Sequence, residues 1–213
     1  MIVSRAGAGI SSTVLEITDA VSAAESSQRH LGLPSALRCG CVSIWLRPVR
    51  HMGEEKRAME PRMKNPAQIL PGAFDAIMAL SKSIEKGGIP RATVELICLR
   101  ASQLNGCSVC VDMHWRGLRK FGEKDERIFA VSAWREAPYY SEAERAALAL
   151  TEAATRLSDR ADPVPDEIWK EAARHYDETQ LAALVMAIGM INLWNRLNAT
   201  TRQVGGEWTA KYV

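Results

Sequence analysis

The stretch LNGCSVCVDMH, residues 104–114, gathers the side chains of this chain that are best suited to chemistry. Cys107 and Cys110 are three residues apart, and His114 follows four residues after the second cysteine. On a helix that begins near residue 108 all three side chains project from one face, because positions three, four and seven apart share a face. Two thiols beside an imidazole form a redox pair, part of a metal site, or a pair of core thiols.

The helices expected before and after the cysteines bring the carboxylate of Glu95 close to the same side chains. Residues 90–106 carry apolar side chains at helical spacing and end in Asn-Gly, which predicts a helix directly before the cysteines. Glu95 lies about 16 Å before the turn and His114 about 12 Å after it, at a rise of about 1.5 Å per residue. In an antiparallel hairpin Glu95 therefore comes level with His114 and can orient its imidazole, which takes the proton from Cys110. The amino end of the second helix further favours the thiolate.

Zinc binding is the first alternative. Cys107, Cys110 and His114 offer three ligands, whereas a structural zinc site has four, and no second Cys-x2-Cys or His-x3-His pattern occurs. Cys98 can supply a fourth ligand only if its helix face turns towards the site. Attachment of c-type haem is excluded, because Val111 stands where that motif needs histidine. Two structural thiols beside a surface histidine are the remaining alternative. We expect no bound cofactor and no metal.

Helical spacing continues through the rest of the chain, and strand patterns are nearly absent. Ser141 and Glu144 have the spacing of a capping box, which marks the start of one helix. Short connections between the segments favour antiparallel neighbours. The segments with helical spacing are 70–88, 90–106, 108–120, 123–137, 141–157, 165–176 and 178–199. The sequence predicts an all-α domain with a central antiparallel helix hairpin.

Residues 1–59 differ in composition from the rest. They contain scattered Gly and Ser, with five arginines and no lysine before Met52. Met52 and Met59 stand just before the helical part begins, so translation can start at either of them. We interpret residues 1–59 as an extension that is flexible or not part of the native chain, and residues 60–213 as the helical domain.

Composition narrows the class of protein. Of the 213 residues 47% are apolar, enough for a full core, and 27 basic residues nearly balance 25 acidic ones. This balance argues against nucleic-acid binding. No apolar run approaches the roughly 18 residues of a membrane span, and the amino end lacks a signal-sequence pattern. Five cysteines, an odd number, argue against a secreted disulfide scaffold and favour the reducing cytoplasm.

The combined spacing of Glu95, Cys107, Cys110 and His114 resembles the active-site signature of the carboxymuconolactone decarboxylase family, in its alkyl hydroperoxidase D-like branch. The stretch RATVELICLRASQLNGCSVCVDMHWRGLRKFG is similar to that family throughout. Two later stretches, YSEAERAALALTEAATRL and INLWNRLNATTRQ, resemble its later helices. The resemblance covers about residues 60–205.

The resemblance implies an all-helical homo-oligomer, commonly a trimer or hexamer, that reduces a hydroperoxide and is itself reduced by a dithiol or a thiol protein. It implies that Cys110 forms the sulfenic acid and that Cys107 donates the proton and then resolves it. Glu95 and His114 match the motif glutamate and histidine. One position departs from the pattern: well-studied members have a histidine between the cysteines, where this chain has Val109.

The expected function is therefore a thiol-dependent peroxidase or disulfide oxidoreductase. Two rivals stay open. One is a lyase that decarboxylates a carboxylated lactone, a reaction that needs no dithiol. The other is a non-enzymatic oligomer that senses redox state, or is stabilised by zinc, through the same cysteines.

The last helix ends in a polar cluster formed by Asn192, Asn195, Arg196 and Asn198. These side chains either bond helix ends or a subunit contact, or line the mouth of the site.

Overall fold

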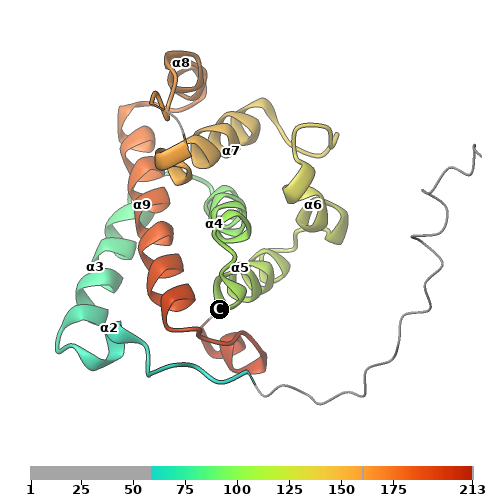
Figure 1. Ribbon diagram of the computed structural model, residues 1–213. Helices are drawn as coiled ribbons and strands as arrows, with labels where there is room; N and C mark the ends of the chain where they lie inside the picture. Colours follow the sequence, from blue (N-terminus) through green and yellow to red (C-terminus); the bar gives the residue numbers. More distant parts are fainter. Residues whose placement is uncertain (1–58, 160, 213) are drawn as a thin grey trace, which may run out of the picture. The chain divides into compact units, whose positions relative to one another are not determined.

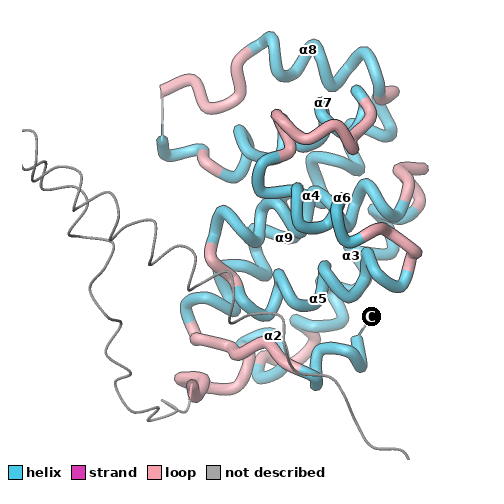
Figure 2. The backbone as a smooth tube through the Cα atoms, turned by 90° about the vertical axis from the view of Figure 1, so that its right-hand side faces the viewer, coloured by secondary structure: helices cyan, strands magenta, loops and turns pink. Residues whose placement is uncertain are grey.

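The structure, a computed structural model, describes residues 59–159 and 161–212. Within these ranges every regular element is a helix, as Figure 2 shows, which confirms the all-α prediction. The elements, in chain order, are α2 (Pro66–Ile69), α3 (Ala73–Glu85), α4 (Arg91–Asn105), α5 (Ser108–Lys120), α6 (Asp125–Ala130), η2 (Val131–Ala133), α7 (Glu142–Thr155), η3 (Leu157–Asp159), α8 (Asp166–His175), α9 (Glu178–Thr200) and η4 (Glu207–Tyr212). The predicted extension, residues 1–59, lies outside the described residues apart from Met59, so the boundary at residue 60 stays a prediction.

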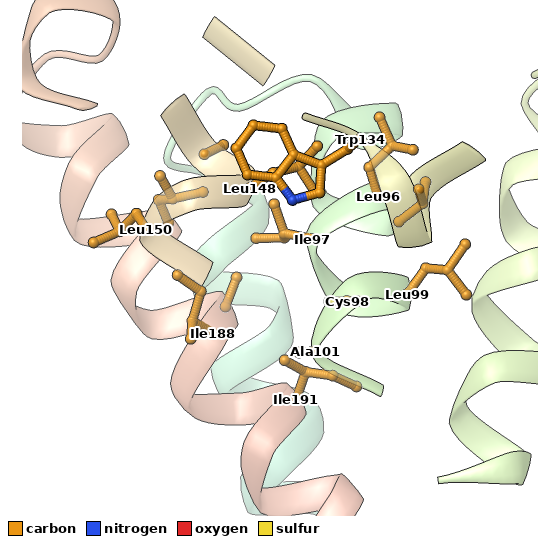
Figure 3. Close-up of a cluster of buried hydrophobic side chains, with 14 of the residues drawn as sticks. Leu96, Ile97, Cys98, Leu99, Ala101, Trp134, Leu148, Leu150, Ile188 and Ile191 are labelled. Carbon is orange, nitrogen blue, oxygen red and sulfur yellow. The ribbon is translucent and has the colours of Figure 1, made fainter. Parts of the chain in front are cut away.

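Helix α4 is the centre of the domain and packs against α5, α7 and α9 (Figure 1). Its side chains are buried on several sides: Leu96 and Ile97 are fully buried and Leu99 is 2% exposed. A helix that is apolar on most of its faces must be surrounded by other elements. In Figure 3 Ile97 lies below the ring of Trp134, and both belong to the same buried core cluster as Leu148 of α7. The helix that carries Glu95 is thus held between three other helices.

A tight turn joins α4 to α5. Gly106 ends α4 in the left-handed region, at φ 65°, where a glycine is favoured because it has no Cβ. The next residue, Cys107, is the N-cap of α5, and its backbone N–H donates to Ser102 O at 3.0 Å. The two helices pack against each other along their lengths, which confirms the predicted central hairpin.

Helix α9 covers one side of α4 and carries α3 on its own outer side (Figure 1). It begins with a capping box in which Asp177 and Gln180 bond each other's backbone N–H groups. The loop after α3 lies directly on α9, since a Cβ built at Gly87 would be 2.2 Å from Ala183 Cβ. None of the helices in the described ranges is long and apolar enough to cross a bilayer.

Helix α7 is tied to α4 by a buried carboxylate. The predicted capping box of Ser141 and Glu144 is present at its start. Glu152, 4% exposed, accepts from Arg100 Nε at 2.6 Å and from Trp134 Nε1 at 2.9 Å. Arg135 NH1 donates to the other carboxylate oxygen at 2.6 Å. A buried charge of this kind is tolerated because each of its oxygens has a partner.

Candidate active site

The cysteine pair lies at the amino end of α5. Cys107 and Cys110 form a disulfide, with Cα atoms 5.4 Å apart. Cys107 Sγ also accepts the backbone N–H of Cys110 at 3.3 Å, so the sulfur of Cys107 caps the helix that carries Cys110. Both side chains are buried, at 2% and 3% exposure. The local sequence produces this arrangement because the turn at Gly106 places one cysteine just before the helix and the other in its first turn.

The two cysteines differ in what they face. A cavity of about 580 Å³ lies between α2, α3, α4, α5, α9 and η4, and Cys110 lines it while Cys107 does not. His114, one turn after Cys110 on the same helix face, also lines the cavity. A molecule in this cavity would meet Cys110 and His114 first, with Cys107 behind them.

Glu95 and His114 meet across the hairpin, at the level that the helix rise predicts. Glu95 Oε2 lies 2.6 Å from His114 Nδ1, and Glu95 is 6% exposed. Because an ionised carboxylate can only accept, we assign the proton of the neutral imidazole to Nδ1. Nε2 of His114 is then left as the basic nitrogen. The carboxylate thus fixes both the direction of the ring and its tautomer.

The electrostatics of this pair keep Glu95 ionised. Burial by itself would raise the pKa of Glu95, but the hydrogen bond from His114 and the positive charge of that ring when it is protonated, followed by the charge and hydrogen bond of Arg91, hold that pKa below its usual range. Arg91 Nε donates to Glu95 Oε1 at 3.0 Å, and Arg91 NH1 donates to Glu85 at 2.8 Å. Each carboxylate oxygen of Glu95 therefore has one partner.

Gly117 is a residue of the site that sequence reasoning missed. It lies one turn after His114 on α5, and a Cβ there would be 2.8 Å from Glu95 Oε2. Only a residue without a side chain lets the carboxylate occupy this position. The available signal was the spacing of three residues from His114, which places Gly117 on the helix face that looks at α4.

Asn198 connects the last helix to the redox pair. Its Nδ2 donates to Cys110 Sγ at 3.3 Å, and its Oδ1 accepts from Asn65 Nδ2 at 2.7 Å. Asn192 and Asn195 instead accept from Asn105 Nδ2 at 3.0 and 2.8 Å, at the end of α4. The asparagines at the polar end of α9 therefore have two different roles. Asn198 lies at the site, whereas Asn192 and Asn195 bind the end of α4.

The rest of the cavity wall is mainly apolar. Its large side chains come from α3, from α5 with its C-cap, and from α9. They include Phe74, Met78, Met113, Phe121, Met190 and Trp194. Phe74 and Trp194 pack edge to face with ring centroids 6.3 Å apart. A concave apolar wall with a few convergent polar groups is typical of a site for a small organic molecule.

Cys98 lines the cavity but remains a core residue. It is 2% exposed and lies between Ile97 and Leu99 on α4 (Figure 3). Burial raises the pKa of its thiol, and the nearby Glu95 carboxylate raises it further. Among residues 59–159 and 161–212 no group of three or more His, Cys, Asp or Glu side chains is arranged to hold a metal ion. Cys39 and Cys41 lie outside the described residues.

Comparisons with known proteins agree with this arrangement. The family model for the carboxymuconolactone decarboxylase family matches residues 71–153. The uncharacterized protein YdfG of Bacillus subtilis (strain 168) is 42% identical over 131 residues, which are 62% of this chain and 88% of YdfG. The alkyl hydroperoxide reductase AhpD of Solibacter usitatus (strain Ellin6076) is 41% identical over 59 residues, 28% of this chain and 33% of that protein.

The fold also matches a solved structure. A protein of unknown function from Agrobacterium tumefaciens, provisionally described as the antioxidant defence protein AhpD, has a TM-score of 0.64 to this chain and 36% sequence identity. The match covers 69% of this chain and 99% of that one. The helical arrangement is thus shared over nearly the whole length of that protein.

Proposed function

This chain belongs to the carboxymuconolactone decarboxylase family, in its alkyl hydroperoxidase D-like branch, and from that premise we propose that it is a thiol-dependent peroxidase. Its substrate is a hydroperoxide, and its reductant is a dithiol or a thiol protein. One observation carries the proposal: Cys110 lines an apolar cavity beside His114, and Cys107 is close enough to have formed a disulfide with it.

In the first step the Cys110 thiolate attacks the outer oxygen of the hydroperoxide. The new S–O bond forms as the O–O bond breaks, so the cysteine is oxidised to a sulfenic acid and the peroxide is reduced. The leaving alkoxide takes one proton and departs as an alcohol. His114 Nε2 is suited to accept the thiol proton beforehand and to return it to the alkoxide, while Glu95 steadies the imidazolium.

In the second step Cys107 resolves the sulfenic acid. Its thiolate attacks Cys110 Sγ, the S–O bond breaks, and hydroxide leaves with a proton as water. The product is the disulfide present in the structure. Two thiols of the reductant then transfer two electrons and two protons, which restores both cysteines and leaves the reductant as a disulfide.

The position between the cysteines changes the proton route. Val109 is 2% exposed and has no titratable group, so it cannot relay a proton as a histidine could. In this chain we therefore assign the histidine part of the proton relay to His114, without a second imidazole between the cysteines.

Assembly and location are part of the proposal. Exposed apolar side chains run along the solvent-exposed face of α9, where Val185, Met186 and Leu193 are 44%, 46% and 39% exposed. Such a stripe supports a homo-oligomer, which we expect to be a trimer or hexamer. A cycle that depends on reduced thiols suits the cytoplasm.

A matched pair of variants tests the proposal. Cys110→Ser should reduce peroxide turnover to the uncatalysed background, because no thiolate faces the cavity. Cys107→Ser should consume one equivalent of hydroperoxide per chain and then stop, because the sulfenic acid has no resolving thiol. Near-full turnover in Cys110→Ser would overturn the assignment, and release of carbon dioxide from a carboxylated lactone by the same variant would favour the lyase.

A further inference from the structure

Three amide contacts lead in one direction from α2 to the redox pair. Asn65 Oδ1, at the N-cap of α2, accepts the backbone N–H of Ala67 at 2.9 Å. Asn65 Nδ2 donates to Asn198 Oδ1 at 2.7 Å. Asn198 Nδ2 donates to Cys110 Sγ at 3.3 Å. The contacts join residues from the beginning and the end of the domain at one sulfur atom.

The donor and acceptor in each of these three hydrogen bonds follow from the first one, between Ala67 and Asn65. The backbone N–H of Ala67 can only donate, so the side-chain oxygen of Asn65 must face it. The NH₂ group of Asn65 then faces Asn198, whose oxygen must accept. What remains for the sulfur of Cys110 is the NH₂ group of Asn198. This logic assigns the orientations of the two side-chain amides.

We propose that Asn198 is a further catalytic residue, which stabilises Cys110 as a thiolate in the reduced protein, and that Asn65 is the positioning residue that keeps its amide facing the sulfur. This inference rests on the proposed function in taking Cys110 as the nucleophile. A thiolate is a stronger acceptor than a thiol, so an N–H donor at this distance favours the charged form. Asn198 is 7% exposed, so little water competes for the contact.

The surroundings of Cys110 make such a donor useful. Val109 beside it is apolar, and the ionised Glu95 disfavours a second negative charge nearby. The titratable or charged side chains that line the same cavity are Glu85 of α3, Arg91, Glu95 and Cys98 of α4, His114 of α5, and Tyr212 of η4. No such group of α9 lines it, so α9 acts on the sulfur through the neutral amide of Asn198.

The test measures thiolate reactivity directly, without peroxide. In a Cys107→Ser background Cys110 is the pair's single thiol, and serine retains an acceptor at the N-cap of α5. The rate of iodoacetamide alkylation of Cys110 is followed from pH 4 to pH 10 by mass spectrometry of its peptide. Asn198→Ala removes the donor. We expect the midpoint of the pH profile to rise by about one unit and the rate at pH values below it to fall about tenfold.

Asn65→Asp tests the positioning role without removing the helix cap. Aspartate still accepts the N–H of Ala67, but its second oxygen cannot donate to Asn198. Asn198 must then turn its NH₂ group towards Asp and its oxygen towards Cys110, and we expect a midpoint rise at least as large as that of Asn198→Ala. Gln68→Glu is the charge-matched control: it adds a carboxylate to α2 on the same cavity, at an exposed position.

Three outcomes decide the proposal. Midpoint rises in Asn198→Ala and Asn65→Asp with a smaller one in Gln68→Glu support both roles. Parent-like profiles in the first two, with thermal melting that shows folded protein, overturn the proposal. Equal shifts in Asn65→Asp and Gln68→Glu overturn the positioning role of Asn65, because added charge alone then explains them. Since no peroxide is present, a failure of the peroxidase assignment leaves this readout unaffected.

Discussion

Gly117 lies directly against the carboxylate of Glu95. A Cβ built at position 117 would be 2.8 Å from Glu95 Oε2, closer than real Cβ contacts. The carboxylate is not free to move aside, since its other oxygen accepts from Arg91 Nε at 3.0 Å. The missing side chain at Gly117 is therefore what allows Glu95 to lie level with His114.

Gly117→Ala should separate Glu95 from His114. An alanine on an open helix face stabilises by about 0.5–1 kcal/mol relative to glycine, but here the methyl group must displace a buried carboxylate. We expect lower stability in chemical denaturation and slower reaction of Cys110 with hydroperoxide.

The control for that variant is Gly189→Ala in α9, where a Cβ would meet nothing within 4 Å. It should be slightly stabilised and fully reactive. If both variants gained stability alike, the close contact between Gly117 and Glu95 would not exist in solution.

Glu95→Gln tests the carboxylate as a positioning residue for His114. Glutamine keeps the volume but removes the charge that steadies the imidazolium. We expect the reaction of Cys110 with hydroperoxide to slow by about 100-fold at neutral pH, the lower end of what a positioned acid–base group contributes. Stopped-flow measurements at a series of pH values would record the rate constant at neutral pH and any shift in the pH dependence of that rate constant.

Glu85→Gln serves as the matched control, because Glu85 also accepts from Arg91 but belongs to α3 and is half-exposed. It should react within about twofold of the parent, as expected for a surface ion pair. Equal slowing in both variants would mean that Arg91, rather than the contact with His114, governs the rate.

Cys98 should be the inert thiol of the helical domain. Burial raises the pKa of its thiol and the nearby Glu95 carboxylate raises that pKa further, so at pH 8 almost none of Cys98 is in the reactive thiolate form. Iodoacetamide applied to the reduced, folded protein should label Cys107 and Cys110 and leave Cys98 free until urea is added. Peptide mass spectrometry reads all three positions, and labelling of Cys98 at a rate comparable to that of Cys110 would contradict its place in the core.

The carboxylate of Glu152 should make stability depend on acid pH. Burial would raise its pKa, but hydrogen bonds from Trp134, Arg135 and Arg100 hold that pKa below its usual range. A folded-state pKa below the unfolded value, about 4.3, gives stability that is present above that pH and lost as pH falls through the folded value.

Glu152→Gln should therefore cost about 3 kcal/mol at pH 7, as for a buried ion pair that loses one partner, and the difference from the parent should shrink below pH 4. Urea denaturation at pH 7 and at pH 3.5 measures both values. The half-exposed Glu171→Gln is the control, since Glu171 pairs with Arg174 and His175 on its own helix, and it should change stability by less than about 0.5 kcal/mol. If the loss of unfolding free energy were the same at both pH values, Glu152 would stabilise the fold through packing and neutral hydrogen bonds rather than through its charge.

The helices and the Glu95–His114 contact could be predicted because both depend on local rules. Apolar spacing and capping residues define α3, α4, α5, α7, α8 and α9, and the rise per residue along one hairpin places side chains that are nineteen positions apart. The helix expected over residues 123–137 is shorter than predicted: α6 ends at Ala130, and the 3-10 helix η2 follows it. The four-residue α2 and the 3-10 helix η4 were not predicted, because each is too short to carry a period.

The contacts with Asn198 and Gly117 could not be predicted in the same way. Asn65 and Asn198 are 133 positions apart, and only the packing of α2 beside the end of α9 joins them. Gly117 matters through the side chain it lacks, which has no periodic signature. A pattern of residue types along one helix shows which face is polar, but not which of its asparagines reaches a sulfur atom.

The most direct test of the redox pair is mass spectrometry of the peptide that holds Cys107 and Cys110. The reduced protein receives one equivalent of an organic hydroperoxide and is then alkylated. We predict fast loss of two hydrogens and of both alkylation sites, one alcohol released per chain, and full recovery after treatment with a dithiol. If both thiols remain alkylatable while the hydroperoxide persists, the pair is not the site of peroxide reduction.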